Sequence, residues 1–127
     1  MKLRIKGATL RLRLTQGEIQ ALHEHGQVEE QVPFAPAVSL TYRLRKDPAA
    51  RAIYASYRGS VVEIVVPAAT ADEWCMSQQV TLAQMQDVGA TALNITLEKD
   101  FACLAPRAGE DESDNFPHPE ALQGKSC

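Results

Sequence analysis

The chain has 127 residues, of which 45% are hydrophobic and 23% are charged, and its formal net charge is −3 at neutral pH. This composition is typical of one globular domain, and the slight excess of acids argues against a nucleic-acid-binding protein, which is usually basic. No apolar run reaches the length of a transmembrane helix, and the three cysteines lack the spacing of a disulfide framework. The sequence therefore predicts a single cytoplasmic domain over residues 1–127, without a membrane or nucleic-acid partner.

The first half of the chain predicts two pairs of strands. In three of four short stretches apolar residues occupy every second position, with charged or polar residues between them, as in strands that bury one face. Gly7 stands between the first two stretches and supplies the positive φ that a tight turn often requires. The predicted strands are residues 2–6, 9–14, 28–34 and 38–45.

A helix is predicted between these two pairs, over residues 16–25. Thr15 and Glu18 have the spacing of a capping box, in which each side chain accepts a hydrogen bond from the backbone of the other residue. Gly26 follows the last helical residue, where glycine commonly ends a helix. The predicted order of the first half is therefore strand, strand, helix, strand, strand.

The second half repeats this order. Gly59 corresponds to Gly7 at an offset of 52 residues, and apolar alternation, a helical stretch and two further strands follow it. The pattern predicts two β-β-α-β-β units, residues 1–47 and 53–100, packed about a pseudo-two-fold axis. We therefore expect an α+β fold whose mainly antiparallel strands form a sheet or a barrel, followed by an irregular tail over residues 101–127.

Cationic residues recur at alternate positions of three predicted strands in the first half. If these strands are neighbours, their side chains share one face, which would suit a phosphate-rich or carboxylate ligand. Strand carboxylates such as Glu63 and Glu98 would neutralise part of this charge by cross-strand pairing. Alternatively, the acidic run of the tail, residues 110–114, folds back over Arg11 and Arg13. The candidate ligand-binding residues are Arg11, Arg13, Arg43 and Arg45.

A metal site in the tail is the second candidate. Thiolate and imidazole are ligands that zinc prefers, and a bound metal would order a proline-rich segment. The spacing is not that of a zinc finger, because no C-x-x-C knuckle is present, and a docked Cys103 with a free Cys127 is the simpler interpretation. The candidate zinc ligands are Cys103, His118 and Cys127, with Asp114 as a fourth.

Three motifs resemble those of a known family. They are Ile5-Lys6-Gly7 with Leu10-Arg11-Leu12-Arg13-Leu14-Thr15, Glu98-Lys99-Asp100-Phe101 with Cys103-Leu104, and Glu110-Asp111-Glu112-Ser113-Asp114 with Phe116-Pro117 and Cys127. Together they resemble a family of small, uncharacterised bacterial proteins classified as a domain of unknown function. The resemblance extends over nearly the whole chain and implies a small cytosolic fold, but no activity, cofactor or partner.

These observations favour a non-enzymatic binding or interaction protein, since no catalytic motif accompanies the arginine-rich strands and the acidic tail. Its partner would be a protein or a small anionic ligand, and a homo-oligomer is also compatible with the sequence. A metal- or thiol-dependent protein that uses Cys103, His118 and Cys127, with zinc as cofactor, is the alternative. A tunnel enzyme acting on a phosphate ligand is less favoured, because it requires Glu63 and Glu98 to hold magnesium beside the arginines.

Overall fold

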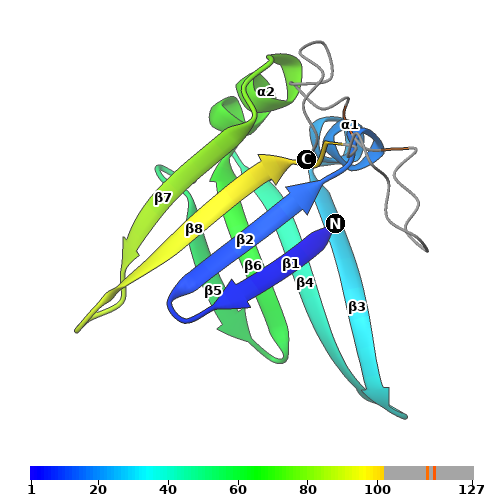
Figure 1. The fold of residues 1–127 in the computed structure, drawn as a ribbon, viewed down its shortest axis with the longest axis vertical. Helices are drawn as coiled ribbons and strands as arrows, with labels where there is room; N and C mark the ends of the chain where they lie inside the picture. Colours follow the sequence, from blue (N-terminus) through cyan, green and yellow to red (C-terminus); the bar gives the residue numbers. More distant parts are fainter. Residues whose placement is uncertain (102–113, 115, 117–127) are drawn as a thin grey trace, which may run out of the picture.

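The computed structural model describes residues 1–101, 114 and 116, and within them the protein is mostly β, with two four-stranded sheets and two helices (Figure 1). The elements are β1 (Lys2–Lys6), β2 (Thr9–Leu14), α1 (Gln16–His25), β3 (Gln27–Ala35), β4 (Val38–Asp47), β5 (Tyr54–Arg58), β6 (Val61–Pro67), α2 (Ala68–Met76), β7 (Thr81–Asp87) and β8 (Ala92–Lys99). The strands of the first half thus begin and end within two residues of their predicted bounds.

Each sheet combines hairpins from both halves of the chain. The strand orders are β1-β2-β8-β7 in the first sheet and β3-β4-β6-β5 in the second. Strands within a hairpin are antiparallel, whereas the central pairs, β2–β8 and β4–β6, are parallel. Exchanging the first five elements with the last five, in order, converts the strand order of one sheet into that of the other. The order β-β-α-β-β therefore occurs twice. The duplication of the sequence itself stays a prediction.

Of the two predicted arrangements, a sheet or a barrel, the barrel is wrong. Among the described residues, the backbone ladders end at the edges of two separate sheets, and none joins β1 to β3 or β5 to β7. The strands are nevertheless mainly antiparallel, in agreement with the predicted α+β class. The parallel pairs could not be expected from alternation, which indicates the face a side chain occupies and not the strand beside it.

Local sequence explains the turns and the first helix. Thr15 Oγ1 accepts a hydrogen bond from Glu18 N at 3.3 Å, and Glu18 Oε1 accepts one from Thr15 N at 2.9 Å, which confirms the capping box. Gly26 ends α1 in the left-handed region, as predicted. Gly7 and Gly59 adopt φ values of 53° and 55° in the turns of the β1–β2 and β5–β6 hairpins, where a side chain would be strained.

All four hairpin turns lie at one end of the molecule, and both helices lie at the other (Figure 1). At the helix end the inner faces of the two sheets meet and form one hydrophobic core, to which each helix adds its apolar side. Trp74 of α2 is fully buried in this core. The largest fully buried side chains are Leu12, Leu14, Leu22, Leu44, Ile64, Val65, Val66, Trp74, Ile95 and Leu97.

Toward the turns, the same inner faces become exposed. Strand alternation places a further set of large apolar residues on these faces, yet their exposed fractions range from 38% to 66%. The two sheets therefore separate as they run from the helices to the turns. The exposed inward-facing strand residues are Ile5, Val32, Val38 and Tyr57, and Val88 lies on the same side just after β7.

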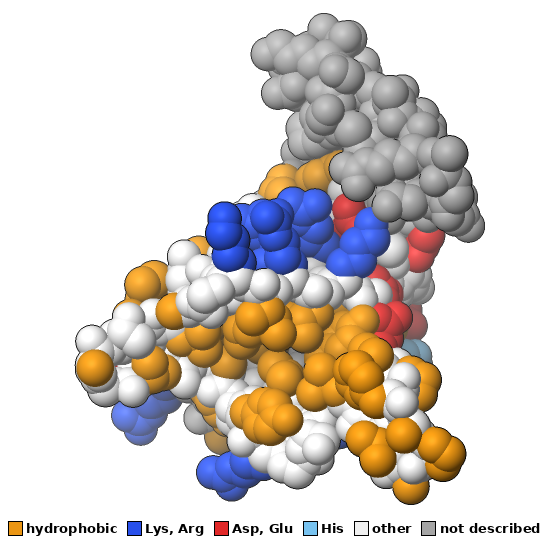
Figure 2. Space-filling view, turned by 60° about the horizontal axis from the view of Figure 1, so that its bottom comes forward, with side chains coloured by type: hydrophobic (Ala, Val, Ile, Leu, Met, Phe, Trp, Pro, Cys, Tyr) orange, Lys and Arg blue, Asp and Glu red, His pale blue; other side chains and the backbone are white. Residues whose placement is uncertain are grey.

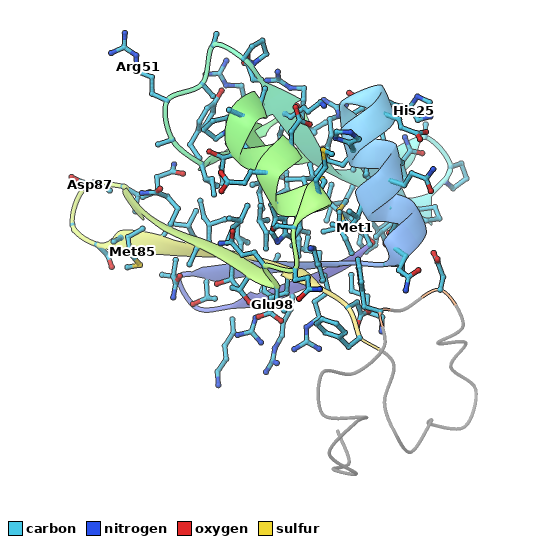
Figure 3. All side chains as sticks on the ribbon, turned by 90° about the horizontal axis from the view of Figure 1, so that it is seen from above. Met1, His25, Arg51, Met85, Asp87 and Glu98 are labelled. Carbon is cyan, nitrogen blue, oxygen red and sulfur yellow. The ribbon has the colours of Figure 1, made fainter. Side chains whose placement is uncertain are left out.

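Polar contacts connect the two sheets at both edges. At the edge formed by β1 and β3, the amino group of Met1 pairs with Glu18 and with Glu30, and Figure 3 shows Met1 below α1. At the edge formed by β5 and β7, the side-chain amide of Gln86 accepts a hydrogen bond from Ala55 N at 2.6 Å and donates one to Ala55 O at 3.0 Å. These contacts hold the sheets together without a continuous ladder.

Candidate functional site

Cations gather on the outer face of the sheet β1-β2-β8-β7. The antiparallel register of β1 and β2 places Lys2 beside Arg13, Arg4 beside Arg11 and Lys6 beside Thr9. Figure 2 shows lysine and arginine side chains in one band on this side of the molecule. On β1, β2 and the adjoining end of β8, the described residues give this face five cations against two carboxylates, a local net charge of +3. The charged residues are Lys2, Arg4, Lys6, Arg11, Arg13, Glu98 and Asp100.

The two carboxylates compensate only part of this charge. Glu98 lies on the side of the sheet away from the helices (Figure 3), with its oxygens 3.3 Å from Arg11 Nε and 3.3 Å from Arg13 Nε. Both Nε atoms are buried and make no well-directed hydrogen bond, so the donors that a ligand could use are the terminal nitrogens of the two guanidinium groups. Arg4 and Lys6 are exposed, and within the described part of the chain no carboxylate pairs with either of them.

A hollow of about 230 Å³ lies between these side chains. Its lining residues, Arg4, Lys6, Thr9 and Arg11, are called here the cationic strip. A guanidinium group can bind a carboxylate or phosphate through two parallel hydrogen bonds, a lysine adds a point charge, and a threonine hydroxyl adds a further donor. The cationic strip therefore has the chemistry of a site for a small anion.

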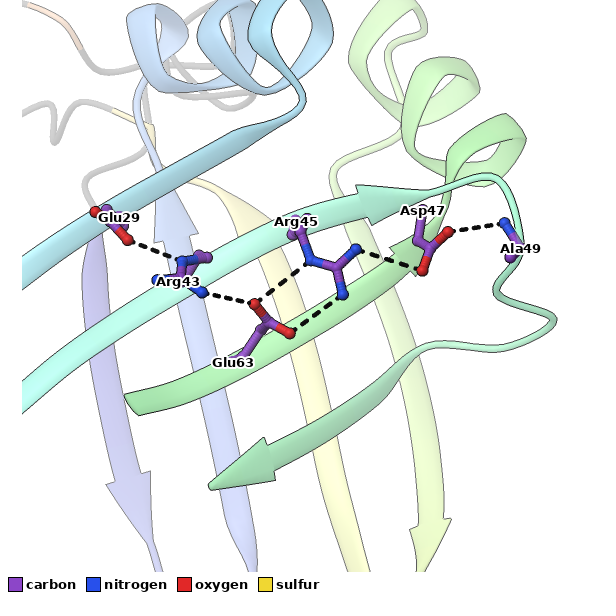
Figure 4. A network of polar contacts seen from close by, with 6 residues as sticks. All are labelled: Glu29, Arg43, Arg45, Asp47, Ala49 and Glu63. Atoms are coloured by element: carbon purple, nitrogen blue, oxygen red, sulfur yellow. Dashed lines mark hydrogen bonds and ion pairs between the residues drawn. The ribbon is translucent and has the colours of Figure 1, made fainter. Parts of the chain in front are cut away.

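Arg43 and Arg45 do not belong to this face. They lie on β4, which pairs with β3 and β6 in the other sheet, so the expectation that the arginines of three strands share one face is wrong. Arg43 donates hydrogen bonds to Glu29 at 2.8 Å and to Glu63 at 2.9 Å, and Arg45 donates to Glu63 and to Asp47 at 3.3 Å (Figure 4). This network uses the two arginines internally and confirms the predicted cross-strand pairing.

Glu63→Gln is expected to lower the free energy of unfolding by about 1–2 kcal/mol at neutral pH, because Arg45 and Arg43 lose the negatively charged carboxylate that both of them bind. Hydrogen bonds from Arg45, and then from Arg43, hold the pKa of the Glu63 carboxyl below its ordinary 4.5. A carboxyl with a lowered pKa stabilises the folded state fully above its unfolded pKa and loses this effect as the pH falls through its folded pKa. The difference from wild type should therefore disappear in acid.

Urea denaturation of both proteins between about pH 7 and pH 3 checks this pH dependence. Glu73→Gln is the control, since Glu73 is an exposed carboxylate on α2. A stability difference for Glu63→Gln that stays constant over this range would contradict the assignment.

A second hollow, here called the tip cleft, lies between the two sheets at the turn end. Its volume is about 430 Å³, within the range of small-molecule pockets, and its lining is largely apolar. Figure 2 shows apolar side chains below the cationic band, on the side where the sheets separate. No sequence signal marks this cleft, because inward-facing residues have the same pattern whether the sheets meet or part. Apolar lining residues include Ile5, Leu10, Leu40, Tyr57, Val62 and Val88.

A third polar cluster lies between the two helices and β4. Asp72 accepts a hydrogen bond from Lys46 Nζ at 2.7 Å and lies 3.0 Å from His23 Nδ1, and these contacts lower the pKa of the Asp72 carboxyl. Cys75 lies nearby on α2, where burial and then the charge of Asp72 raise the pKa of its thiol. A thiol with a raised pKa is protonated at neutral pH and is a poor nucleophile. This cluster therefore supports the packing of the helices.

Most of the predicted metal site lies outside the described residues. Asp114 is described, and it contacts the start of α1: its carbonyl oxygen accepts a hydrogen bond from Gln16 N at 3.0 Å and its Oδ1 accepts one from Gly17 N at 3.2 Å. Among the described residues no group of three or more potential ligands is arranged to hold a metal. The zinc site and the contact of the acidic run with Arg11 and Arg13 stay predictions. The candidate ligands outside the described part are Cys103, His118 and Cys127.

Comparison with protein-family models gives a match over residues 1–120 to a family of unknown function. No curated protein and no solved structure gives a significant match to the chain. Within the described residues, neither helix has the length and apolar character needed to cross a membrane. The function must therefore be argued from the surfaces of the protein itself.

Proposed function

Because the chain belongs to a family of unknown function, DUF7009, we propose its role from its own surface: it is a binding protein that takes a small anionic ligand on the cationic strip. The observation that carries this proposal is that Arg4 and Lys6 border a hollow with no carboxylate partner among the described residues. Isolated surface cations are common, but cations that converge on one hollow favour a ligand that bears phosphate or carboxylate groups.

The contrast between the two sheets supports this choice. On β4, Arg43 and Arg45 hydrogen-bond to carboxylates on three strands and have little donor capacity left for a ligand. On β2, Arg11 has one ion pair with Glu98, at 3.3 Å, and its Nε is not directed at that oxygen. A ligand anion would complete the coordination of Arg11 and compensate the charge of its neighbours.

Lys6→Gln and Arg4→Gln are each expected to weaken the binding of inorganic pyrophosphate by about five- to tenfold, since each removes one cation from the strip. Isothermal titration calorimetry at low ionic strength measures the affinity, which should fall as salt is added. Arg58→Gln is the matched control, because Arg58 stands before Gly59 in the other sheet as Lys6 stands before Gly7.

Two outcomes would reject the proposal. One is the absence of pyrophosphate binding to the wild-type protein. The other is an equal loss of affinity in Arg58→Gln and Lys6→Gln, because binding would then follow overall charge and not the cationic strip.

A further inference from the structure

We infer that the anionic ligand carries an apolar chain and that this chain lies in the tip cleft, so that the protein binds an anionic amphiphile such as a fatty acid. This inference rests on the proposed function, since it assigns the head group to the cationic strip. It extends that function by naming the ligand class and a second contact surface.

The β1–β2 hairpin forms a wall of both surfaces. Along β1, Arg4 and Lys6 face outward and belong to the cationic strip, while Ile5 between them faces inward and lines the tip cleft. Along β2, Leu10 lies opposite Ile5 on the inner face, and Arg11 follows on the outer face. Because β1 is an edge strand, a ligand can contact both faces of this hairpin by passing around the edge or the turn.

The cleft itself favours an apolar occupant. Ile5, Tyr57 and Val88 line it with exposed fractions of 59%, 66% and 51%, which is unusual for apolar side chains on inner sheet faces. Most of its lining is apolar, and the amide of Gln86 is already hydrogen-bonded to both backbone groups of Ala55. Burial of these side chains against an alkyl chain would remove apolar surface from water and so favour binding.

Charge and shape select this occupant over a membrane or a second copy of the chain. The apolar residues face one another across a cleft of about 430 Å³, which suits a single chain of limited length better than a flat lipid surface. The cations on the outer face of the same hairpin complement a carboxylate or phosphate head group. A second copy would bring its own cations to the same interface, where they would repel.

The test is calorimetric titration with decanoate, decanol, acetate and pyrophosphate. Decanoate should bind the wild-type protein at least about tenfold more tightly than either acetate or decanol. Ile5→Asp should weaken decanoate binding by at least about tenfold and pyrophosphate binding by a much smaller factor, because the new carboxylate lies in the cleft, on the opposite face of β1 from the cationic strip. Lys6→Gln should weaken decanoate binding and leave decanol binding unchanged.

Met85→Asp is the control for Ile5→Asp, because both residues are 59% exposed while Met85 lies on β7 outside the cleft lining. It should change none of these affinities. Tyr57→Asp is a second cleft variant, on another hairpin, and it should weaken decanoate binding as Ile5→Asp does. Circular dichroism confirms that each variant is folded.

Several results would overturn the inference. If decanoate binds no more tightly than acetate while pyrophosphate still binds, the inference that the ligand carries an apolar chain is wrong, and the proposed function stands. If neither pyrophosphate nor decanoate binds, both fail. Binding only to phosphatidylglycerol vesicles would assign the cleft to a membrane, and a dimer in size-exclusion chromatography that Ile5→Asp dissociates would assign it to a second copy.

Discussion

Trp74→Ala is expected to lower the free energy of unfolding by about 3–5 kcal/mol, the largest loss that a single substitution should cause in this protein. The Trp74 side chain is 0% exposed and packs where α2 meets both sheets. Its Nε1 donates a hydrogen bond to Val80 O at 3.2 Å, and its ring lies 5.9 Å from Lys99 Nζ. Removing the indole leaves a cavity, and the buried ammonium group of Lys99 loses its contact with the ring.

Urea denaturation followed by circular dichroism measures this loss. Met76→Ala is the control on the same helix, because Met76 is 76% exposed and its truncation should change stability by no more than about 0.5 kcal/mol. Trp74→Phe retains most of the volume and loses the Nε1 hydrogen bond, so an intermediate loss is expected. A loss below about 1 kcal/mol for Trp74→Ala would show that this core does not depend on the indole.

Glu18→Gln should give the second-largest effect, a loss of about 2–3 kcal/mol. Glu18 Oε1 accepts a hydrogen bond from Thr15 N as part of the capping box, while Oε2 pairs with the amino group of Met1. The Met1 side chain is fully buried, and Glu30 is the other carboxylate near the amine, at 3.3 Å. Glutamine can retain the contact with Thr15, but it removes one of the two charges that compensate this ammonium group.

Glu24→Gln is the control for this substitution, since Glu24 is an exposed carboxylate on the same helix. It should leave the midpoint of urea denaturation nearly unchanged. Equal effects of the two substitutions would mean that the amine of Met1 is hydrated in the folded protein and not bound by Glu18.

Much of the fold follows from local sequence, because hairpins and helix ends are determined by neighbouring residues. Gly7 and Gly59 mark turns, and Thr15 with Glu18 marks the start of a helix, whatever the rest of the chain does. The hairpin that lies beside each hairpin in its sheet, by contrast, comes from a distant part of the sequence. The pairing of β2 with β8 joins residues more than eighty positions apart, and nothing in the alternation of either strand specifies it.

The four residues of the cationic strip lie on one local hairpin, but the carboxylates that compensate the neighbouring cations come from distant strands, so the sequence indicates the cations and not their partners. The role of Arg11 as a ligand-binding residue stays a prediction, and its separation from Arg43 follows from the division of the strands between two sheets. Whether an arginine is available for a ligand depends on the carboxylate across the strand: Glu63 serves both Arg43 and Arg45, whereas Arg4 faces Arg11. The tip cleft requires the angle between the sheets, for which the sequence carries no signal.

The central position of β8 determines when this protein can fold during synthesis. Among the strands that the structure describes, β8 is the last to leave the ribosome, yet it lies between β2 and β7 and completes the first sheet. Until residues 92–99 have emerged, the inner face of the β1–β2 hairpin, with Leu12 and Leu14, lacks its parallel neighbour. The two halves therefore fold together, late and through distant contacts, which is a slow route. A product truncated before β8 would leave the edge of the β1–β2 hairpin and the whole of β7 unpaired, and would be prone to aggregate.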